Sequence, residues 1–96
     1  MKSLRLTNEL RRAAEKCVWF EPPEQAVRIS PRLAAYILTF GSQEDVAALR
    51  AQASLADLRE YLDAAPPGIF DARSWAYWNL MVGRPKAPPM PTRSFV

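Results

Sequence analysis

The sequence lacks histidine altogether and contains one cysteine among its 96 residues. Without histidine, the chain has no imidazole base, no Ser-His or Cys-His nucleophile pair and none of the usual zinc-ligand sets. The single cysteine, Cys17, cannot form an internal disulfide, which fits a reducing cytoplasm. We therefore expect a cytoplasmic protein that is not an enzyme and that has no catalytic residues, metal site or cofactor.

Long apolar runs and strand-like alternation are also missing. No uninterrupted apolar stretch follows Lys2 and Arg5 at the N-terminus, and charged residues recur along the chain, so neither a signal peptide nor a transmembrane helix is predicted. Apolar residues make up 49% of the chain and charged residues 24%, as in an ordinary folded protein. A chain of this length is expected to form one domain with one modest core.

Acidic residues are absent from the last part of the chain. Residues 72–96 carry four basic and no acidic side chains, residues 18–71 carry four basic and eight acidic ones, and residues 1–17 carry five basic and two acidic ones. The net charge of +3 is therefore divided between two basic ends around an acidic middle. Such a distribution does not by itself indicate a face for nucleic acid.

Apolar residues at helical spacing predict an all-α fold, a compact bundle of about five short helices. The expected helix starts, in chain order, are Thr7 or Asn8, Ser30, Ser42, Ser54 and Asp71. Residues 20–29 are expected to be extended or irregular, and Leu55, Leu58 and Leu62 are expected to face the core. The last helix, which ends near Val82, is apolar nearly all round and is therefore predicted to be central and surrounded.

The predicted domain spans residues 1–83, and an extended, basic, proline-rich tail spans residues 84–96. Prolines reduce the entropy that an extended segment loses when it docks on a partner, and basic side chains can pair with an acidic groove. Tryptophans in a helix most simply anchor a core, but they are also favoured at interface hot spots. The candidate partner-binding residues are Trp75, Trp78, Arg84, Lys86, Met90, Arg93 and Phe95. A tail that is merely a disordered end is the alternative interpretation.

Two other interpretations concern residues 44–63. This stretch fits a helix-turn-helix template, but the outward side chains of the second helix carry a net charge of −2, which would repel phosphates. Contacts to DNA would then fall to Arg5, Arg11 and Arg12. The pairs Asp57/Glu60 and Glu60/Asp63 each share a helix face, as metal ligands or, more simply, as parts of a solvated acidic surface.

Part of the chain, about residues 19–83, resembles a family of short bacterial proteins encoded just before a nucleotidyltransferase-like toxin. The likeness is carried, in chain order, by Trp19, Pro22 or Pro23, Ala35-x-Ile37-Leu38-x-x-Gly41-x-x-Glu44-Asp45-x-x-x-Leu49, Leu58-Arg59-Glu60 and Ser74-Trp75-x-x-Trp78. The resemblance implies a helical, antitoxin-like protein that binds and restrains the toxin from the adjacent gene. It supplies no catalytic residues.

The first hypothesis is therefore an antitoxin-like protein-interaction module. The alternative is a small helix-turn-helix DNA-binding transcriptional regulator, and a third is a small subunit that stabilises a larger enzyme. No membrane partner is expected, and the sequence leaves the oligomeric state open.

Overall fold

The computed structural model describes residues 1–92, and within this range it contains six helices and no strand. In chain order the helices are α1 (Asn8–Cys17), α2 (Pro23–Ala26), α3 (Ser30–Phe40), α4 (Gln43–Arg50), α5 (Leu55–Asp63) and α6 (Ala72–Met81). The all-α prediction is confirmed. The prediction of an irregular stretch over residues 20–29 is partly wrong, because α2 occupies Pro23–Ala26, while most of the residues on either side of it form turns and bends. Pro23 stands at the start of α2, where a helix does not need the amide hydrogen that proline lacks.

Most of the predicted helix starts are confirmed by side-chain capping. The caps that accept a backbone hydrogen bond are Thr7 on α1, Ser42 on α4, Ser54 on α5 and Asp71 on α6. In α4 and α5, the aspartate at the third helical position also accepts a bond from the amide of the capping serine, which completes a capping box. Local sequence therefore determines where these four helices begin.

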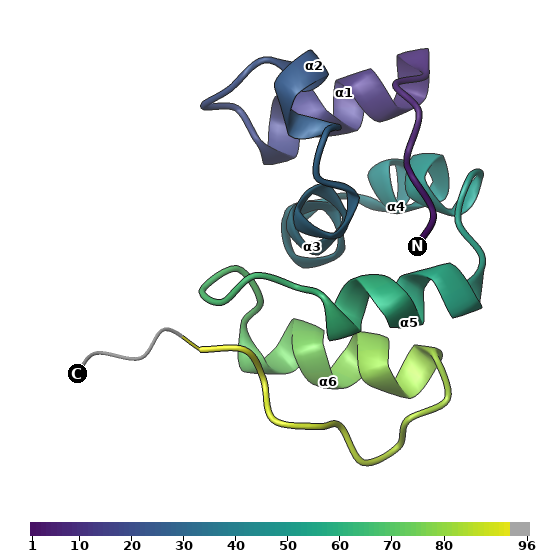
Figure 1. Cartoon of the computed structure of the whole chain (residues 1–96), viewed down its shortest axis with the longest axis vertical. Coiled ribbons are helices and arrows are strands. Elements are labelled where there is room, and N and C mark those ends of the chain that lie inside the picture. The colour runs from purple at the N-terminus through teal and green to yellow at the C-terminus, as the bar shows by residue number, and fades with distance from the viewer. Residues whose placement is uncertain (93–96) are drawn as a thin grey trace.

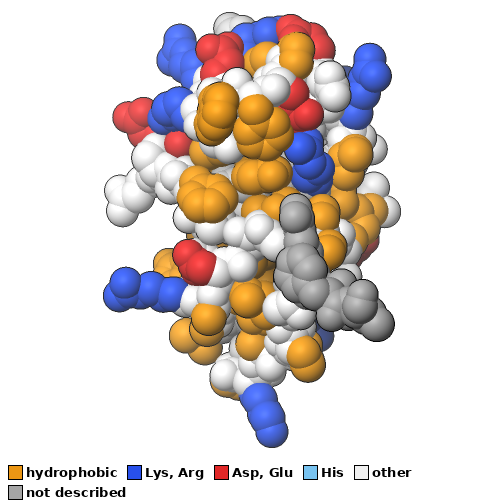
Figure 2. All heavy atoms as spheres, turned by 90° about the vertical axis from the view of Figure 1, so that its left-hand side faces the viewer, with side chains coloured by type: hydrophobic (Ala, Val, Ile, Leu, Met, Phe, Trp, Pro, Cys, Tyr) orange, Lys and Arg blue, Asp and Glu red, His pale blue; other side chains and the backbone are white. Residues whose placement is uncertain are grey.

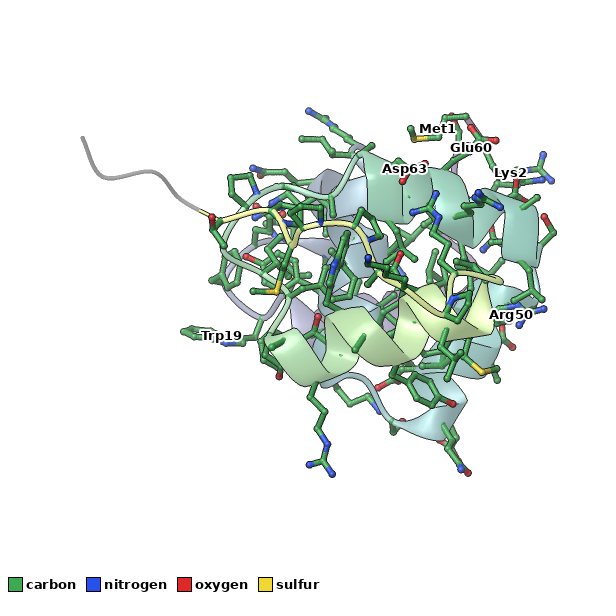
Figure 3. The ribbon with its side chains drawn as sticks, turned by 90° about the horizontal axis from the view of Figure 1, so that it is seen from below. Met1, Lys2, Trp19, Arg50, Glu60 and Asp63 are labelled. Atoms are coloured by element: carbon green, nitrogen blue, oxygen red, sulfur yellow. The ribbon has the colours of Figure 1, made fainter. Side chains whose placement is uncertain are left out.

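Ser30 does not cap its own helix. The residue in the capping position of α3 is Ile29, and the Ser30 hydroxyl instead accepts a hydrogen bond from the Leu4 amide at 2.9 Å. This bond is one of several that hold the extended N-terminal residues across the bundle. The Gln52 side chain exchanges two bonds with the Arg5 backbone, each of 2.7 Å, and the Tyr61 hydroxyl donates to the carbonyl of Lys2. Figure 3 shows Met1 and Lys2 near Glu60 of α5.

Helix α3 occupies the centre of the bundle. It contacts each of the other five helices, and Figure 1 shows it end-on, between the α1–α2 pair and the α5–α6 pair. Leu33, Ala34, Ala35 and Ile37 are almost completely buried. The two alanines on this helix allow neighbouring helices to approach closely, while the leucine and isoleucine fill the space between them.

Helix α6 lies at the edge of the bundle, and the prediction of a central position is wrong. It packs only against α3 and α5, with Trp75, Trp78 and Asn79 buried. The opposite side of α6 leaves Tyr77 and Leu80 more than half exposed. An apolar outer side thus remains without a neighbour in residues 1–92. The core prediction for α5 is also partly wrong, because Leu55 is exposed and Tyr61 is buried beside Leu58 and Leu62.

The corner between α3 and α4 depends on Gly41. A Cβ atom at this position would lie 2.6 Å from the carbonyl oxygen of Ile37 and 2.9 Å from the Cβ of Asp45. Any other residue would therefore push the first turn of α4 away from the end of α3. The glycine is needed here for close approach of the two helices.

After α6, the chain turns back along the helices. Gly83 has a φ of 90°, a conformation that favours glycine, and the Arg84 amide then donates to the Asn79 carbonyl at 2.8 Å. From there, residues 84–92 form no helix, and Figure 1 shows the segment running back beside α6. The indole of Trp75 donates to the Pro88 carbonyl at 2.8 Å, and Met90 packs against the core.

Candidate functional site

The two tryptophans proposed for partner binding, Trp75 and Trp78, lie in the core. Their side chains are 5% and 9% exposed. Both indole N–H groups are bonded within the fold, that of Trp75 to Pro88 and that of Trp78 to the carbonyl of Leu38 at 2.8 Å. In this conformation neither indole is available to a partner, so both act as anchors that join α6 to the tail and to α3.

The proposed tail residues are placed in three different ways. Arg84 donates to Asn79 and forms an ion pair with Asp63 at 2.7 Å, so its charge is used within the fold. Lys86 is exposed, and Met90 is partly buried against the core. Arg93 and Phe95 lie outside the described residues.

A different group of four aromatic side chains lies at the surface, three of them exposed and Tyr36 partly buried. Trp19 and Phe20 follow α1, and Tyr36 and Phe40 lie one turn apart on α3; together we call these four side chains the aromatic ridge. The ring centroids of Trp19 and Phe20 are 5.7 Å apart with the planes at 86°, and those of Phe20 and Tyr36 are also 5.7 Å apart. Tyr36 and Phe40 extend the row at 6.3 Å. Trp19 is 79% exposed and Phe40 63% exposed.

The ridge is held in place by its surroundings. Val18, immediately before Trp19, is fully buried and its amide bonds to α1, which fixes where the segment leaves the helix. The guanidinium of Arg32 lies 5.7 Å from the Phe20 ring centroid and 5.3 Å from that of Tyr36, and it is ion-paired with Glu21. The rings of Phe20 and Tyr36 are thus supported by packing and by the guanidinium of Arg32, whose charge is balanced by Glu21.

Two views show the surroundings of the ridge. Figure 2 looks at the side from which the α1–α2 segment projects, and hydrophobic side chains gather there among charged ones. Figure 3 shows Trp19 pointing outward from the edge of the molecule. The ridge therefore presents apolar surface to solvent next to polar groups, which is the usual make-up of a protein-interaction site.

Part of the ridge is visible in the sequence, in the positions of two aromatic residues on α3. On α3, the buried stripe runs through Leu33, Ala34, Ile37 and Leu38, so Tyr36 and Phe40 fall outside it. Large aromatics off the buried stripe of a helix indicate either a second packing partner or a binding surface. Only the structure brings Trp19 and Phe20 beside them.

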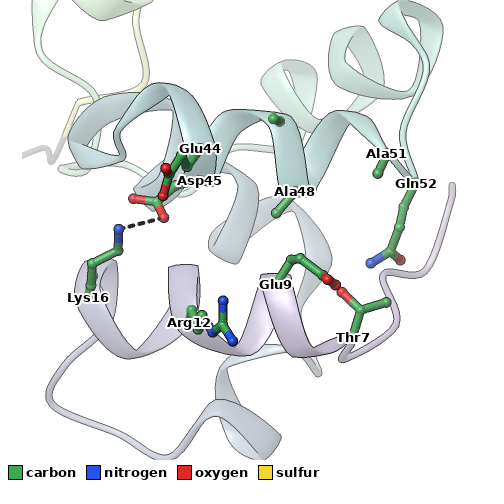
Figure 4. A pocket seen from close by; sticks show the side chains of 10 residues that line it. Thr7, Glu9, Arg12, Lys16, Glu44, Asp45, Ala48, Ala51 and Gln52 are labelled. Carbon is green, nitrogen blue, oxygen red and sulfur yellow. Dashed lines mark ion pairs between the residues drawn. The ribbon is translucent and has the colours of Figure 1, made fainter.

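A groove of about 510 Å³ lies between α1 and α4, and Figure 4 shows its lining. At one end, the Lys16 ammonium lies 2.9 Å from the buried Asp45 carboxylate. Burial acts to raise the pKa of Asp45, but hydrogen bonds from Lys16 and Ser42 outweigh burial and hold this pKa below its usual value. The Asp45 carboxylate therefore has two partners, the ammonium group of Lys16 and the capping residue Ser42 of α4.

Cys17, close to this pair, is buried at the end of α1. Burial, with a smaller contribution from the nearby Asp45 charge, raises the pKa of the thiol to about 11. A thiol with such a pKa is almost entirely protonated near neutral pH and is a poor nucleophile.

The acidic residues of α5 are engaged in structural contacts. Asp57 accepts a hydrogen bond from the amide of the capping Ser54, Asp63 pairs with Arg84, and Glu60 lies 3.7 Å from the N-terminal ammonium. Among the described residues, no group of three or more His, Cys, Asp or Glu side chains is arranged to hold a metal ion. These contacts favour the interpretation of the acidic face of α5 as an ordinary polar surface.

The helix-turn-helix template does not match the packing of α4 and α5. In that motif the two helices pack against each other across a short turn. Here α4 packs on α1 and α3, whereas α5 packs on α3 and α6, and α4 and α5 make no direct helix contact. Of the arginines considered for DNA, Arg11 is ion-paired with Glu24, and Arg12 lines the α1–α4 groove together with acidic residues.

No protein-family model matches the sequence, and no curated protein or solved structure is significantly similar to it. Within residues 1–92, none of the helices combines the length and the hydropathy needed to cross a bilayer. The resemblance to antitoxin-like proteins stays a prediction.

Proposed function

We propose that this protein is an antitoxin-like interaction module of the cytoplasm that binds and restrains a nucleotidyltransferase-type toxin encoded by the adjacent gene. The partner class comes from the resemblance described above. The binding surface that we assign to it is the aromatic ridge, in place of the buried Trp75 and Trp78.

The observation that carries this proposal is the exposure of Trp19, Phe20 and Phe40 along one row of aromatic rings, in which Tyr36 joins Phe20 to Phe40. Aromatic side chains of this size bury about 150–250 Å² each when covered, and tryptophan and tyrosine dominate the energetics of many interfaces. The bundle gains little from leaving these rings in water. A partner that covers them would gain apolar burial from side chains that are already held in position, which reduces the entropy lost on binding.

We propose that the position of the ridge accounts for restraint of the partner. The ridge projects from one side of the bundle, so a partner bound there would have the α1–α2 segment and α3 against its surface. We propose that this contact covers the substrate-binding surface of the toxin. The basic tail, with Lys86 exposed, would add contacts to an acidic part of the same surface.

The proposal is tested by co-expression with the product of the adjacent gene, followed by size-exclusion chromatography with light scattering. A stoichiometric complex is expected for the wild-type protein and for Leu55→Ala, which removes an exposed apolar side chain outside the ridge. Trp19→Ala and Phe40→Ala are expected to weaken the complex at least tenfold. A wild-type protein that elutes alone, or ridge variants that bind as well as Leu55→Ala, would contradict the proposal.

A further inference from the structure

The outer side of α6 is a second apolar surface, separate from the aromatic ridge. Tyr77, Leu80 and Met81 stand at the spacing of one helix stripe, and they are 53%, 58% and 43% exposed. Ala76, one turn before Leu80, is exposed as well. Helix α6 is apolar on both sides, but the bundle covers only one of them, so the other side resembles half of a helix–helix interface.

A groove runs beside this stripe. It has a volume of about 410 Å³ and lies between α6 and the α3–α4 corner, with Leu38, Val46, Tyr77 and Trp78 supplying its apolar lining. With ten residues, α6 is about 15 Å long. An apolar stripe of this length on α6, next to a groove, fits the recognition mode in which an amphipathic helix lays its apolar face into a hydrophobic groove.

The side chains that line the groove carry charge of one sign only. Arg73 is the only charged residue that lines the groove, and it forms no ion pair with any residue in 1–92. Residues 72–92 contain no acidic side chain. The nearest carboxylate along the chain, Asp71, accepts the Ser74 amide as the cap of α6. Hydrogen bonds from Ser74 lower the pKa of Asp71, and Arg73 is close enough for its charge to help lower it, but Asp71 does not line the groove and forms no ion pair with Arg73. A partner that brings carboxylates to the edge of the groove would therefore meet a lining whose net charge is positive.

We propose that the outer side of α6 and the adjoining groove form a docking site for an amphipathic helix that is acidic on its polar face. Its apolar side chains, spaced one helical turn apart, would cover Tyr77, Leu80 and Met81, and a glutamate or aspartate would pair with Arg73. Two copies of this chain fit the same chemistry less well, because residues 72–81 of α6 contain no acidic side chain to pair with Arg73 of the other copy. This site is independent of the proposed toxin contact on the ridge.

The full-length protein is titrated into a fluorescein-labelled helical peptide of about 18 residues, with leucines on one face and glutamates on the other. The matched probe has lysines in place of the glutamates. A saturable rise in anisotropy is expected for the glutamate peptide, with at least tenfold weaker binding of the lysine peptide. Leu80→Lys should abolish binding, whereas Leu55→Lys, another exposed leucine, should not. Arg73→Glu should reverse the preference between the two peptides.

Three results would overturn this inference. One is the absence of binding by either peptide, and another is equal binding of both. The last is concentration-dependent dimerisation of the protein that Leu80→Lys removes, which would assign the surface to a second copy. Trp19→Ala should bind the glutamate peptide as the wild-type protein does. This variant therefore distinguishes a failure of the proposed toxin contact on the aromatic ridge from a failure of the proposed docking site on α6.

Discussion

The indole Nε1–H of Trp78 donates to the carbonyl of Leu38 at 2.8 Å, and this bond connects the edge helix α6 to the last turn of the central helix α3. Carbonyls in the last turn of a helix have no partner within the helix. Trp78 supplies that partner from another helix, at a site that excludes water.

The first prediction concerns this bond. Trp78→Phe keeps an aromatic ring but leaves the Leu38 carbonyl buried without a donor, so the free energy of unfolding should fall by about 2 kcal/mol. Urea unfolding followed by circular dichroism measures the change. Trp19→Phe makes the same replacement at an exposed tryptophan and should stay within about 0.5 kcal/mol of wild type. Equal losses in the two variants would show that the bond does not matter.

The second prediction concerns acid unfolding. Because the folded pKa of Asp45 is held low, the unfolded chain takes up a proton first as pH falls through the ordinary carboxyl range near about 4. The stabilisation from Asp45 is therefore complete above about pH 5 and is lost as pH falls through the folded pKa. Free energies of unfolding measured from pH 7 to pH 2.5 should decline less steeply in Asp45→Asn than in wild type.

The control for this effect is Glu44→Gln, which changes the exposed neighbour of Asp45 and should keep the wild-type slope. Some slope should remain in Asp45→Asn, since hydrogen bonds to capping amides also hold the pKa values of Asp57 and Asp71 low. Identical acid dependence in wild type and Asp45→Asn would rule out the proposed role of the Lys16–Asp45 pair.

The third prediction concerns Cys17. Because the thiol is buried and its pKa is about 11, the native protein should react with a thiol reagent at pH 8 at least a hundredfold more slowly than the protein in denaturant. Absorbance of the released thiolate follows the reaction directly, since the chain has a single cysteine. Rapid stoichiometric labelling of the native protein would contradict the burial of this side chain.

The fourth prediction separates two basic residues of the tail. Arg84 donates to Asn79 and pairs with Asp63, so Arg84→Ala should lower the free energy of unfolding by about 1 kcal/mol, a value reduced by the exposure of Asp63. Lys86→Ala should change it by less than about 0.5 kcal/mol, because Lys86 is exposed. Thermal melts of the two variants make the comparison. A larger loss for Lys86→Ala would mean that this segment is anchored differently.

Helix starts were the part of the fold most accessible from sequence. Ser42 and Ser54 cap their helices through residues three positions away, so the signal is local and the pattern shows it. Ser30 carries the same signal, yet its hydroxyl bonds to Leu4, twenty-six positions earlier. A contact of this separation depends on how α3 packs, and no local pattern contains it.

The surface was harder to predict than the core, because exposure depends on which helices are neighbours. The sequence of α6 predicts a central helix. Its position at the edge is set by α3, whose small residues allow five other helices to pack against it. Likewise, Phe20 and Tyr36 meet only because α2 turns the chain back on α3. Their separation in sequence hides the ridge.

The most direct test of the central claim is the dissociation constant of the complex with the adjacent-gene toxin, measured by isothermal titration calorimetry for wild type, Trp19→Ala and Leu55→Ala. We expect a 1:1 complex whose dissociation constant rises at least tenfold in Trp19→Ala and by less than twofold in Leu55→Ala. Equal affinities for Trp19→Ala and wild type, or no heat of binding for any of the three, would contradict it.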